Sequence, residues 1–127
     1  MAAAVPKGWV PDRRDMIWIN FNPKFDSETG REMKDEHPML VLSSKAFNQR
    51  TGIVIGLPMT HAASNESNPF AVKVTGIKGQ VAYVLAHQPK SFDWRGRGAR
   101  PHPWKQVTPT VFEAAREELN SILSLGT

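Results

Sequence analysis

The sequence predicts a single, mainly β domain, built as a small, strongly bent sheet or partly open barrel with one helix at its C-terminal end. Five short segments have the alternating or fully apolar pattern of β-strands, whereas one stretch alone has extended helical periodicity. The chain has 127 residues, which suffices for one domain with its own core. It contains no cysteine, so the fold must rest on packing without disulfides.

The first predicted strand is DMIWINF, residues 15–21. Met16, Trp18 and Asn20 alternate there with Ile17, Ile19 and Phe21, and aromatic and β-branched residues favour strands. The 17 residues that follow, 22–38, form a polar stretch longer than most connections in a compact domain, which indicates a functional or mobile loop. Two apolar runs come next, MLVLS (39–43) and GIVIGLPMT (52–60). We expect both to be central strands, with one short helical turn between them.

The second half of the chain supplies two more strands and the helix. FAVKVTG (70–76) alternates like a strand with one solvated face, and QVAYVLA (80–86) is a further strand. The helix is predicted to start with Thr108 as its N-cap and Pro109 in the first helical position, with Gly126 as a possible stop. Its predicted apolar face consists of Val111, Phe112, Ala115, Leu119, Ile122 and Leu123.

The composition favours an anionic partner. Sixteen Lys and Arg against twelve Asp and Glu give a net charge of +4 and a pI near 9.7, and the excess is concentrated between Lys90 and Lys105. The N-terminal residues lack an apolar signal core, and no apolar run approaches the ~20 residues that cross a bilayer. We therefore expect one cytoplasmic domain over residues 1–127, away from membranes, with residues 1–9 as a flexible extension.

Familiar nucleotide and zinc signatures are absent from the sequence. It has no GxxxxGK[ST] loop, no GxGxxG after a strand and no HExxH. The four histidines are far apart and lack the spacing of metal ligands, so we expect neither a metal nor a cofactor.

The remaining candidates for chemistry stand at predicted strand ends. Thr60 closes a buried strand, His87 follows another, and His37 precedes Pro38, whose ring pushes the residue before it into the extended region. Strand ends are where scaffolds present functional groups. The alternative is that His37 and His87 merely cap strand ends through hydrogen bonds, which is the commoner role of an isolated histidine.

The succession VPDRRDMIWINFNP, HPMLVLS, AFNQRTG, LPMT, NPFAVKV and HQPKSFDWRGRGA resembles the MazF/PemK family of bacterial toxins, from about Val10 to the end of the chain. The resemblance implies an SH3-like or CcdB-like barrel with a C-terminal helix. It also implies a homodimer that cuts single-stranded RNA without metal at short sequences. Such toxins are neutralised by an antitoxin with a disordered tail, and the basic charge of this chain suits an acidic tail as well as RNA.

The family's site residues carry over in part. Its threonine in the P-x-T strand end corresponds to Thr60, which the resemblance makes a donor to the scissile phosphate. The arginine of its RP motif is His37 here, and the aspartate of its DQ motif is His87. A second arginine, just before that DQ in PemK-like members, is replaced by Leu85. These departures leave the fold assignment intact and change the expected chemistry.

Metal-free RNA cleavage needs a base for the 2′-OH proton, an acid for the leaving oxygen and donors that stabilise the transition state. Histidine, with an ordinary pKa near 6.5, can carry a proton in either direction, whereas arginine cannot. Our hypothesis is that His37 and His87 form the acid–base pair with Thr60 as donor. Arg31 or Lys34, in the loop before His37, would replace the missing cationic clamp.

The segment KSFDWRGRGARPHPW combines aromatic and basic residues, the pattern that holds unpaired nucleic acid. For Trp94, burial in the core or in a dimer interface is an equal alternative to base stacking. The predicted RNA contacts are Lys24, Arg31, Lys34, Gln88, Lys90, Trp94, Arg95, Arg97 and Arg100.

Three other functions remain open on the sequence. The altered site could be a degenerate one that binds RNA or antitoxin without cutting. The chain could act like the related CcdB proteins, which poison gyrase through the C-terminal helix, or it could be a general RNA-binding barrel without toxicity.

Overall fold

The computed structural model describes residues 5–22 and 35–126. Within these ranges the chain forms seven β-strands, two α-helices and two short 3-10 helices. The strands are β1 (Asp15–Asn20), β2 (Glu36–Val41), β3 (Ile53–Thr60), β4 (Ala71–Thr75), β5 (Val81–Leu85), β6 (Lys90–Asp93) and β7 (Arg100–Gln106). The helices are α1 (Lys45–Thr51), η1 (Ala63–Ser67), η2 (Ile77–Gly79) and α2 (Pro109–Leu123).

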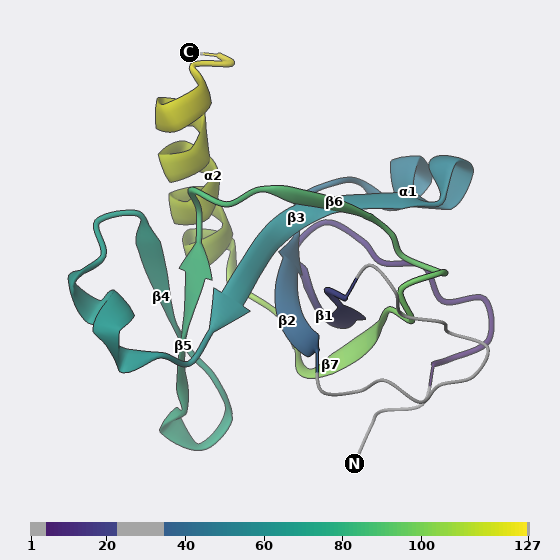
Figure 1. The fold of residues 1–127 in the computed structure, drawn as a ribbon, viewed down its shortest axis with the longest axis horizontal. Helices are drawn as coiled ribbons and strands as arrows, with labels where there is room; N and C mark the ends of the chain where they lie inside the picture. Colours follow the sequence, from purple (N-terminus) through teal and green to yellow (C-terminus); the bar gives the residue numbers. More distant parts are fainter. Residues whose placement is uncertain (1–4, 23–34, 127) are drawn as a thin grey trace.

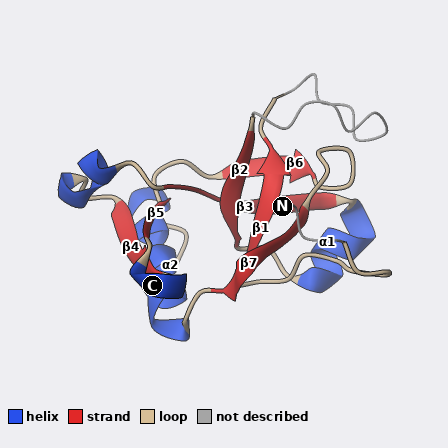
Figure 2. Cartoon of the chain, turned by 90° about the horizontal axis from the view of Figure 1, so that it is seen from below, coloured by secondary structure: helices blue, strands red, loops and turns tan. Residues whose placement is uncertain are grey.

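The strands form one curled antiparallel sheet with the order β4-β5-β3-β2-β1-β7, and β6 pairs separately with β3. Strand β3 pairs with three other strands. Residues 53–56 pair with β6, residues 56–58 with β2 and residues 59–60 with β5. Strands β1, β2, β3, β6 and β7 make the partly open barrel, while β4 and β5 lie beside α2 (Figures 1 and 2). The predicted bent sheet with a C-terminal helix is confirmed.

Two hydrophobic clusters fill the two parts of the molecule, and the alternation of β1 contributes to both. Ile17 and Ile19 are fully buried inside the barrel with Met39, while Met16 faces the cluster beneath α2. Ala115 is the buried residue of α2 and packs in that second cluster. Because successive side chains of β1 point to opposite sides of the sheet, this one strand contributes to the barrel core and to the core beneath the helix.

The five predicted strands are present, and two further strands were not predicted. Both β6 and β7 lie in the basic segment after Gln88, where their sequences KSFD and RPHPWKQ lack an apolar alternation. Proline is tolerated in β7 because this strand ends the order of the sheet and pairs with β1 alone among its described neighbours. Strand β2 also begins earlier than predicted and includes His37, in keeping with the extended backbone expected before Pro38.

Both α-helices carry the caps that their sequences encode. The Ser44 side chain accepts a hydrogen bond from the amide of Phe47 at the start of α1, which extends over more than the single turn predicted. At the start of α2, Thr108 accepts one from the amide of Val111, as its predicted N-cap role requires.

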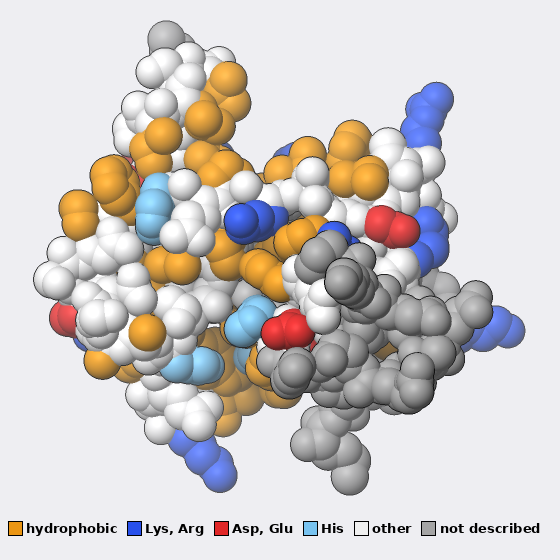
Figure 3. All heavy atoms as spheres, viewed as in Figure 1, with side chains coloured by type: hydrophobic (Ala, Val, Ile, Leu, Met, Phe, Trp, Pro, Cys, Tyr) orange, Lys and Arg blue, Asp and Glu red, His pale blue; other side chains and the backbone are white. Residues whose placement is uncertain are grey.

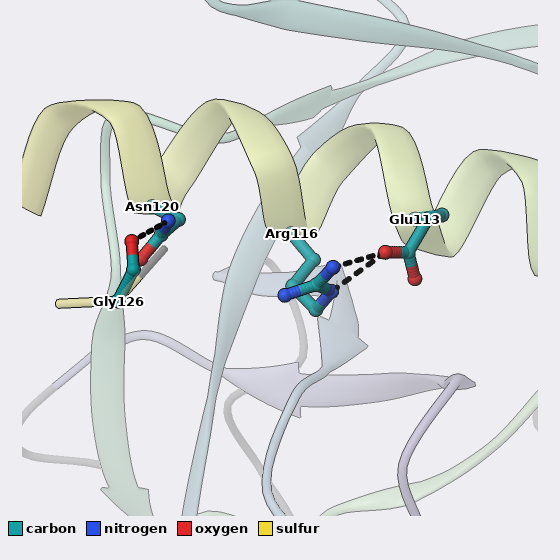
Figure 4. Close-up of polar contacts among 4 residues, drawn as sticks. All are labelled: Glu113, Arg116, Asn120 and Gly126. Atoms are coloured by element: carbon teal, nitrogen blue, oxygen red, sulfur yellow. Dashed lines mark hydrogen bonds and ion pairs between the residues drawn. The ribbon is translucent and has the colours of Figure 1, made fainter. Parts of the chain in front are cut away.

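The C-terminal end of α2 differs from the prediction. The helix ends at Leu123 because Ser124 adopts a left-handed conformation with φ 55°, so the stop is Ser124 and not Gly126. The carbonyl of Gly126 instead accepts a hydrogen bond from the Asn120 side chain at 2.9 Å (Figure 4). Among the helices in residues 5–22 and 35–126, none is long and apolar enough to cross a membrane.

Candidate active site at the strand ends

The sheet brings the start of β2 to the end of β3. These strands are antiparallel, and the last pair of their register joins Met39 to Pro58, so His37 lies two residues before one partner and Thr60 two residues after the other. At its end β3 leaves β2 and pairs with β5, where Thr60 stands opposite Tyr83. Strand β3 therefore lies between β2 and β5, and it pairs with β2 as far as Pro58 and with β5 at Met59 and Thr60.

His37 presents an exposed imidazole at the barrel rim. Its backbone pairs with Ile19 in β1, and its ring meets the edge of Phe21 with 5.2 Å between ring centroids. Both residues line a shallow pocket of about 320 Å³ together with Asn22 and Asp35. The next residue, Pro38, is buried, so the backbone beneath the imidazole is fixed while the ring stays accessible.

The Thr60 hydroxyl is suited to donate to a ligand. Its Oγ1 accepts a hydrogen bond from the amide of Ala62 at 3.2 Å, which leaves the hydroxyl proton for another acceptor. Its strand neighbour Tyr83 donates to the Glu66 carboxylate at 2.5 Å, and Lys73 pairs with the same carboxylate at 3.3 Å. The Tyr83 bond lowers the pKa of Glu66 and raises the pKa of Tyr83, and it ties η1 to the strand beside Thr60.

His87 lies half-buried in the turn that joins β5 to β6. Its ring packs against Phe70, with 5.2 Å between centroids and 31° between planes. Nδ1 is buried and has no hydrogen-bond partner among the described residues, and Nε2 lies 3.2 Å from the side-chain nitrogen of Gln88. A buried ring nitrogen without a partner is costly, and such an atom is suited to a proton donor or acceptor supplied by a substrate.

His37 lies on β2, Thr60 lies at the end of the neighbouring β3, and His87 lies in the turn after β5. In the described part of the chain, no hydrogen bond or ring contact joins His37, Thr60 and His87 to one another, since each meets a different neighbour. The turn carrying His87 runs alongside β3, because β5 pairs with Thr60 and Lys90 of β6 pairs with Gly56. Figure 3 shows histidine side chains among hydrophobic ones on the face viewed in Figure 1.

The predicted RNA contacts have different environments. Lys24, Arg31 and Lys34 lie outside the described residues. Gln88 and Lys90 are exposed close to His87, which suits contacts with a bound strand.

The two arginines after β6 pack against aromatic rings. Exposed Arg95 has its guanidinium carbon 4.2 Å from the centre of the Trp94 ring. The guanidinium carbon of Arg97 lies 4.8 Å from the centre of the Phe92 ring, and the guanidinium donates to the carbonyl of Asn20 at 3.4 Å. Some of its contacts therefore stabilise the barrel.

Two predicted contacts require correction. Trp94 is 5% exposed and donates from Nε1 to the carbonyl of Asn48 at 2.8 Å, so it packs in the barrel core and cannot stack on a base. The Arg100 guanidinium forms a two-pronged ion pair with Glu36, with only 12% and 11% of the two side chains exposed. The guanidinium is paired with Glu36 and largely buried, which indicates a structural role in place of an RNA contact.

A further cluster of ionisable and aromatic side chains was not recognised as a site from the sequence. Trp18, His61, His102 and Trp104, together termed the histidine–tryptophan pocket, line a pocket of about 360 Å³. His102 is 6% exposed, and burial, assisted by the charges of His61 and Arg100, lowers its pKa to about 4. The HPW sequence at 102–104 was the available signal in the sequence. It indicates a cluster only together with Trp18, which the pairing of β1 with β7 brings beside it.

Lowering the pH is expected to destabilise the protein through His102. In the folded protein its pKa is about 4 instead of the ordinary 6.5, so between these values the unfolded chain binds a proton that the folded chain does not. Stability is unaffected above about 6.5 and falls as the pH is lowered toward 4, by at most about 3 kcal/mol. Urea unfolding of His102→Asn should show a shallower loss over this window, and an unchanged loss would contradict the assignment.

The chain matches known proteins along most of its length. Residues 12–123 match the family described as PemK-like, MazF-like toxin of type II toxin–antitoxin system. The Escherichia coli (strain K12) endoribonuclease toxin MazF is 31% identical over 115 residues, which cover 91% of this chain and 96% of that protein. The E. coli endoribonuclease PemK is 26% identical over 113 residues, which cover 87% of this chain and 81% of PemK.

A solved structure agrees with these sequence matches. The crystal structure of MazE–MazF from Deinococcus radiodurans contains a chain that is 32% identical to this one. The two folds superpose with a TM-score of 0.75, and the match covers 93% of this chain and 99% of the other.

Proposed function

This chain belongs to the family of PemK-like, MazF-like toxins of type II toxin–antitoxin systems, and from that premise we propose that it is a sequence-specific endoribonuclease. Its substrate is single-stranded RNA, including mRNA, and the cuts inhibit translation and growth. The observation that supports this proposal is the placement of Thr60 at the end of β3, where its hydroxyl accepts from the Ala62 amide and donates to no acceptor among the described residues, while His37 lies near the start of the neighbouring β2.

In the proposed reaction His37 and His87 carry protons. One imidazole removes the 2′-OH proton of the RNA while the O2′ atom attacks the adjacent phosphorus. The bond from phosphorus to the 5′-oxygen breaks, and the other imidazole gives that oxygen its proton. The products are a 2′,3′-cyclic phosphate and a 5′-hydroxyl, so protons and atoms balance without a metal ion.

Thr60 and nearby cations stabilise the charge of the transition state in this scheme. The Thr60 hydroxyl donates to a non-bridging phosphate oxygen. Exposed Lys90 and Arg95 hold neighbouring phosphates along the path of the RNA. Arg31 or Lys34 supplies the clamp that arginine provides in other members of the family, and this assignment rests on the sequence.

The proposed partners follow from the family and from the charge. We expect a homodimer and an antitoxin whose acidic, disordered tail binds the basic toxin, as the net charge of +4 favours. The Deinococcus MazF structure was solved together with MazE. We expect the toxin to bind both its RNA substrate and its antitoxin in the cytoplasm.

Cleavage of RNA in EDTA tests the proposed function. Purified protein and its Thr60→Val variant are incubated with a long single-stranded RNA in excess EDTA, and the ends of the fragments are mapped. We expect discrete cuts with 2′,3′-cyclic phosphate and 5′-hydroxyl ends, and their loss in Thr60→Val, which keeps the shape of the side chain without its hydroxyl. Intact RNA at every protein concentration would contradict the proposal and favour a binding or gyrase-directed function.

A further inference from the structure

Phe70, the residue before β4, is held beside His87 by its own backbone. Its amide donates a hydrogen bond to the side-chain oxygen of Asn68 at 2.9 Å, and its carbonyl accepts one from the amide of Ala86 at 3.2 Å. These bonds continue the pairing of β4 with β5 as far as the residue that precedes His87. The position of the Phe70 ring is therefore fixed by the sheet.

The Phe70 ring packs against the imidazole of His87. The two ring centroids are 5.2 Å apart and the planes are inclined by 31°, within the ~4.5–7 Å at which aromatic rings attract one another. Phe70 is 40% exposed and belongs to neither hydrophobic cluster of the described residues. Among those residues its ring meets no aromatic ring except that of His87. This phenylalanine supports the imidazole and contributes little to the core.

Gln88 contacts the same imidazole through its side-chain amide. The amide nitrogen lies 3.2 Å from Nε2 of His87. An amide suits an imidazole in either protonation state, because a half-turn about its last bond presents the NH2 group or the oxygen to Nε2. While Nε2 is held in this way, Nδ1 keeps a proton or a lone pair that no described residue uses.

The orientation of His87 depends on these two contacts. A histidine that transfers protons is commonly oriented by a carboxylate or a backbone carbonyl. In the part of the chain that the structure describes, neither kind of group forms a hydrogen bond or an ion pair with His87. Because misplacement of a reacting group by about 1 Å can slow a reaction ~10²-fold, the ring needs another support.

From these contacts we propose that Phe70 and Gln88 are positioning residues for the His87 imidazole. Phe70 fixes the plane of the ring and Gln88 holds Nε2, which leaves Nδ1 for proton transfer. The inference rests on the proposed ribonuclease function and deepens it. The face of the Phe70 ring also attracts the positive charge of a protonated imidazole, so the contact persists after the ring takes up a proton. A direct contact of Phe70 with RNA is the competing role, and it would act on RNA affinity.

The cleavage test compares Phe70→Leu with the matched control Phe47→Leu, which removes a 38% exposed ring from α1. On a short RNA with one mapped cut site, we expect kcat to fall roughly tenfold in Phe70→Leu with KM almost unchanged. Phe47→Leu should match the wild type, and Phe70→Tyr, which keeps the ring, should retain most of the rate. In the His87→Ala background Phe70→Leu should cause no further loss, because no imidazole remains to be held. Equal slowing in both backgrounds would overturn the proposal.

The mobility of the His87 ring is measured without RNA by ¹³C relaxation, so that failure of the positioning and failure of the ribonuclease give different results. We expect an ordered ring in the wild type and in Phe47→Leu, and a lower order parameter in Phe70→Leu and in Gln88→Leu. This result would support the positioning even if the wild type proved unable to cut RNA. An equally ordered ring in all four proteins would overturn it.

RNA affinity separates positioning from direct contact. Thr60→Val protein, with and without Phe70→Leu, is titrated with a short single-stranded RNA. Equal affinities are the expected result, since the positioning of His87 affects the reaction and leaves RNA binding unchanged. Weaker binding in the double variant, together with an ordered His87 ring in Phe70→Leu, would assign Phe70 to RNA contact and contradict the proposal.

Discussion

Alanine in place of His37 or His87 is expected to lower the rate of RNA cleavage at neutral pH by about two to four orders of magnitude in each variant. Each substitution removes one of the two proton carriers, and neither Thr60 nor a nearby arginine can take over a proton transfer at this pH. Because the pair acts as a unit, the double variant should be little slower than the slower single variant. Initial rates on a short RNA that contains one mapped cut site would measure these effects.

The family's arginine provides a matched control for this prediction. His37→Arg restores the residue of the RP motif and supplies a permanent positive charge, but it cannot exchange protons near pH 7. We expect it to remain nearly as slow as His37→Ala. Activity equal to that of the wild type would show that position 37 contributes charge and not proton transfer.

Removal of Glu36 is expected to destabilise the protein by about 3–5 kcal/mol, because it leaves the Arg100 guanidinium buried without its counter-charge. The two side chains are only 11% and 12% exposed, and the pair links the start of β2 to β7 across β1, which lies between them. Glu36 directly precedes His37, so Glu36→Leu should also lower the cleavage rate by displacing the imidazole. Urea unfolding would measure the first effect.

Two further variants separate burial from charge. In Glu36→Leu/Arg100→Met both partners are apolar, so most of the lost stability should return. Glu113→Gln breaks the exposed ion pair with Arg116 on α2 (Figure 4) and should leave the free energy of unfolding almost unchanged. Equal losses in Glu36→Leu and Glu113→Gln would contradict a structural role for the buried pair.

The core of the fold was predictable because its strands have clear periodicity. The alternation of DMIWINF and the apolar run of GIVIGLPMT indicated β1 and β3, and the structure buries most of their apolar residues, with Ile55 exposed. Strands β6 and β7 gave no such signal, since they lie among basic residues and prolines and are held by pairing with distant strands. Tertiary pairing outweighed local propensity at these two strands.

For the candidate site, the sequence allowed prediction only of the residues that stand at strand ends. Pro38 after His37 and Pro58 two residues before Thr60 marked strand ends, and the structure places His37 near the start of β2 and Thr60 at the end of β3. The roles of Trp94 and Arg100 depended on contacts with Asn48 and Glu36, which no sequence spacing encodes. Aromatic residues among basic ones have the same pattern whether they stack on RNA or fill a core.

The histidine–tryptophan pocket could not be predicted from the sequence either. Trp18 and His102 belong to segments near opposite ends of the chain, and the pairing of β1 with β7 brings their rings within 4.7 Å. The opposite tautomers of His61 and His102 are set by single backbone groups. Such features require the three-dimensional structure.

The pH dependence of RNA cleavage tests most directly the central claim, that two histidines replace the usual residues of this toxin site. Rates are measured in EDTA from about pH 5 to about pH 9 for the wild type, His37→Ala and His87→Ala, since histidine ordinarily titrates near 6.5. We predict a bell-shaped profile for the wild type and the loss of one limb in each single variant. A wild-type rate that stays flat across this range, with a similar rate in both variants, would contradict the claim.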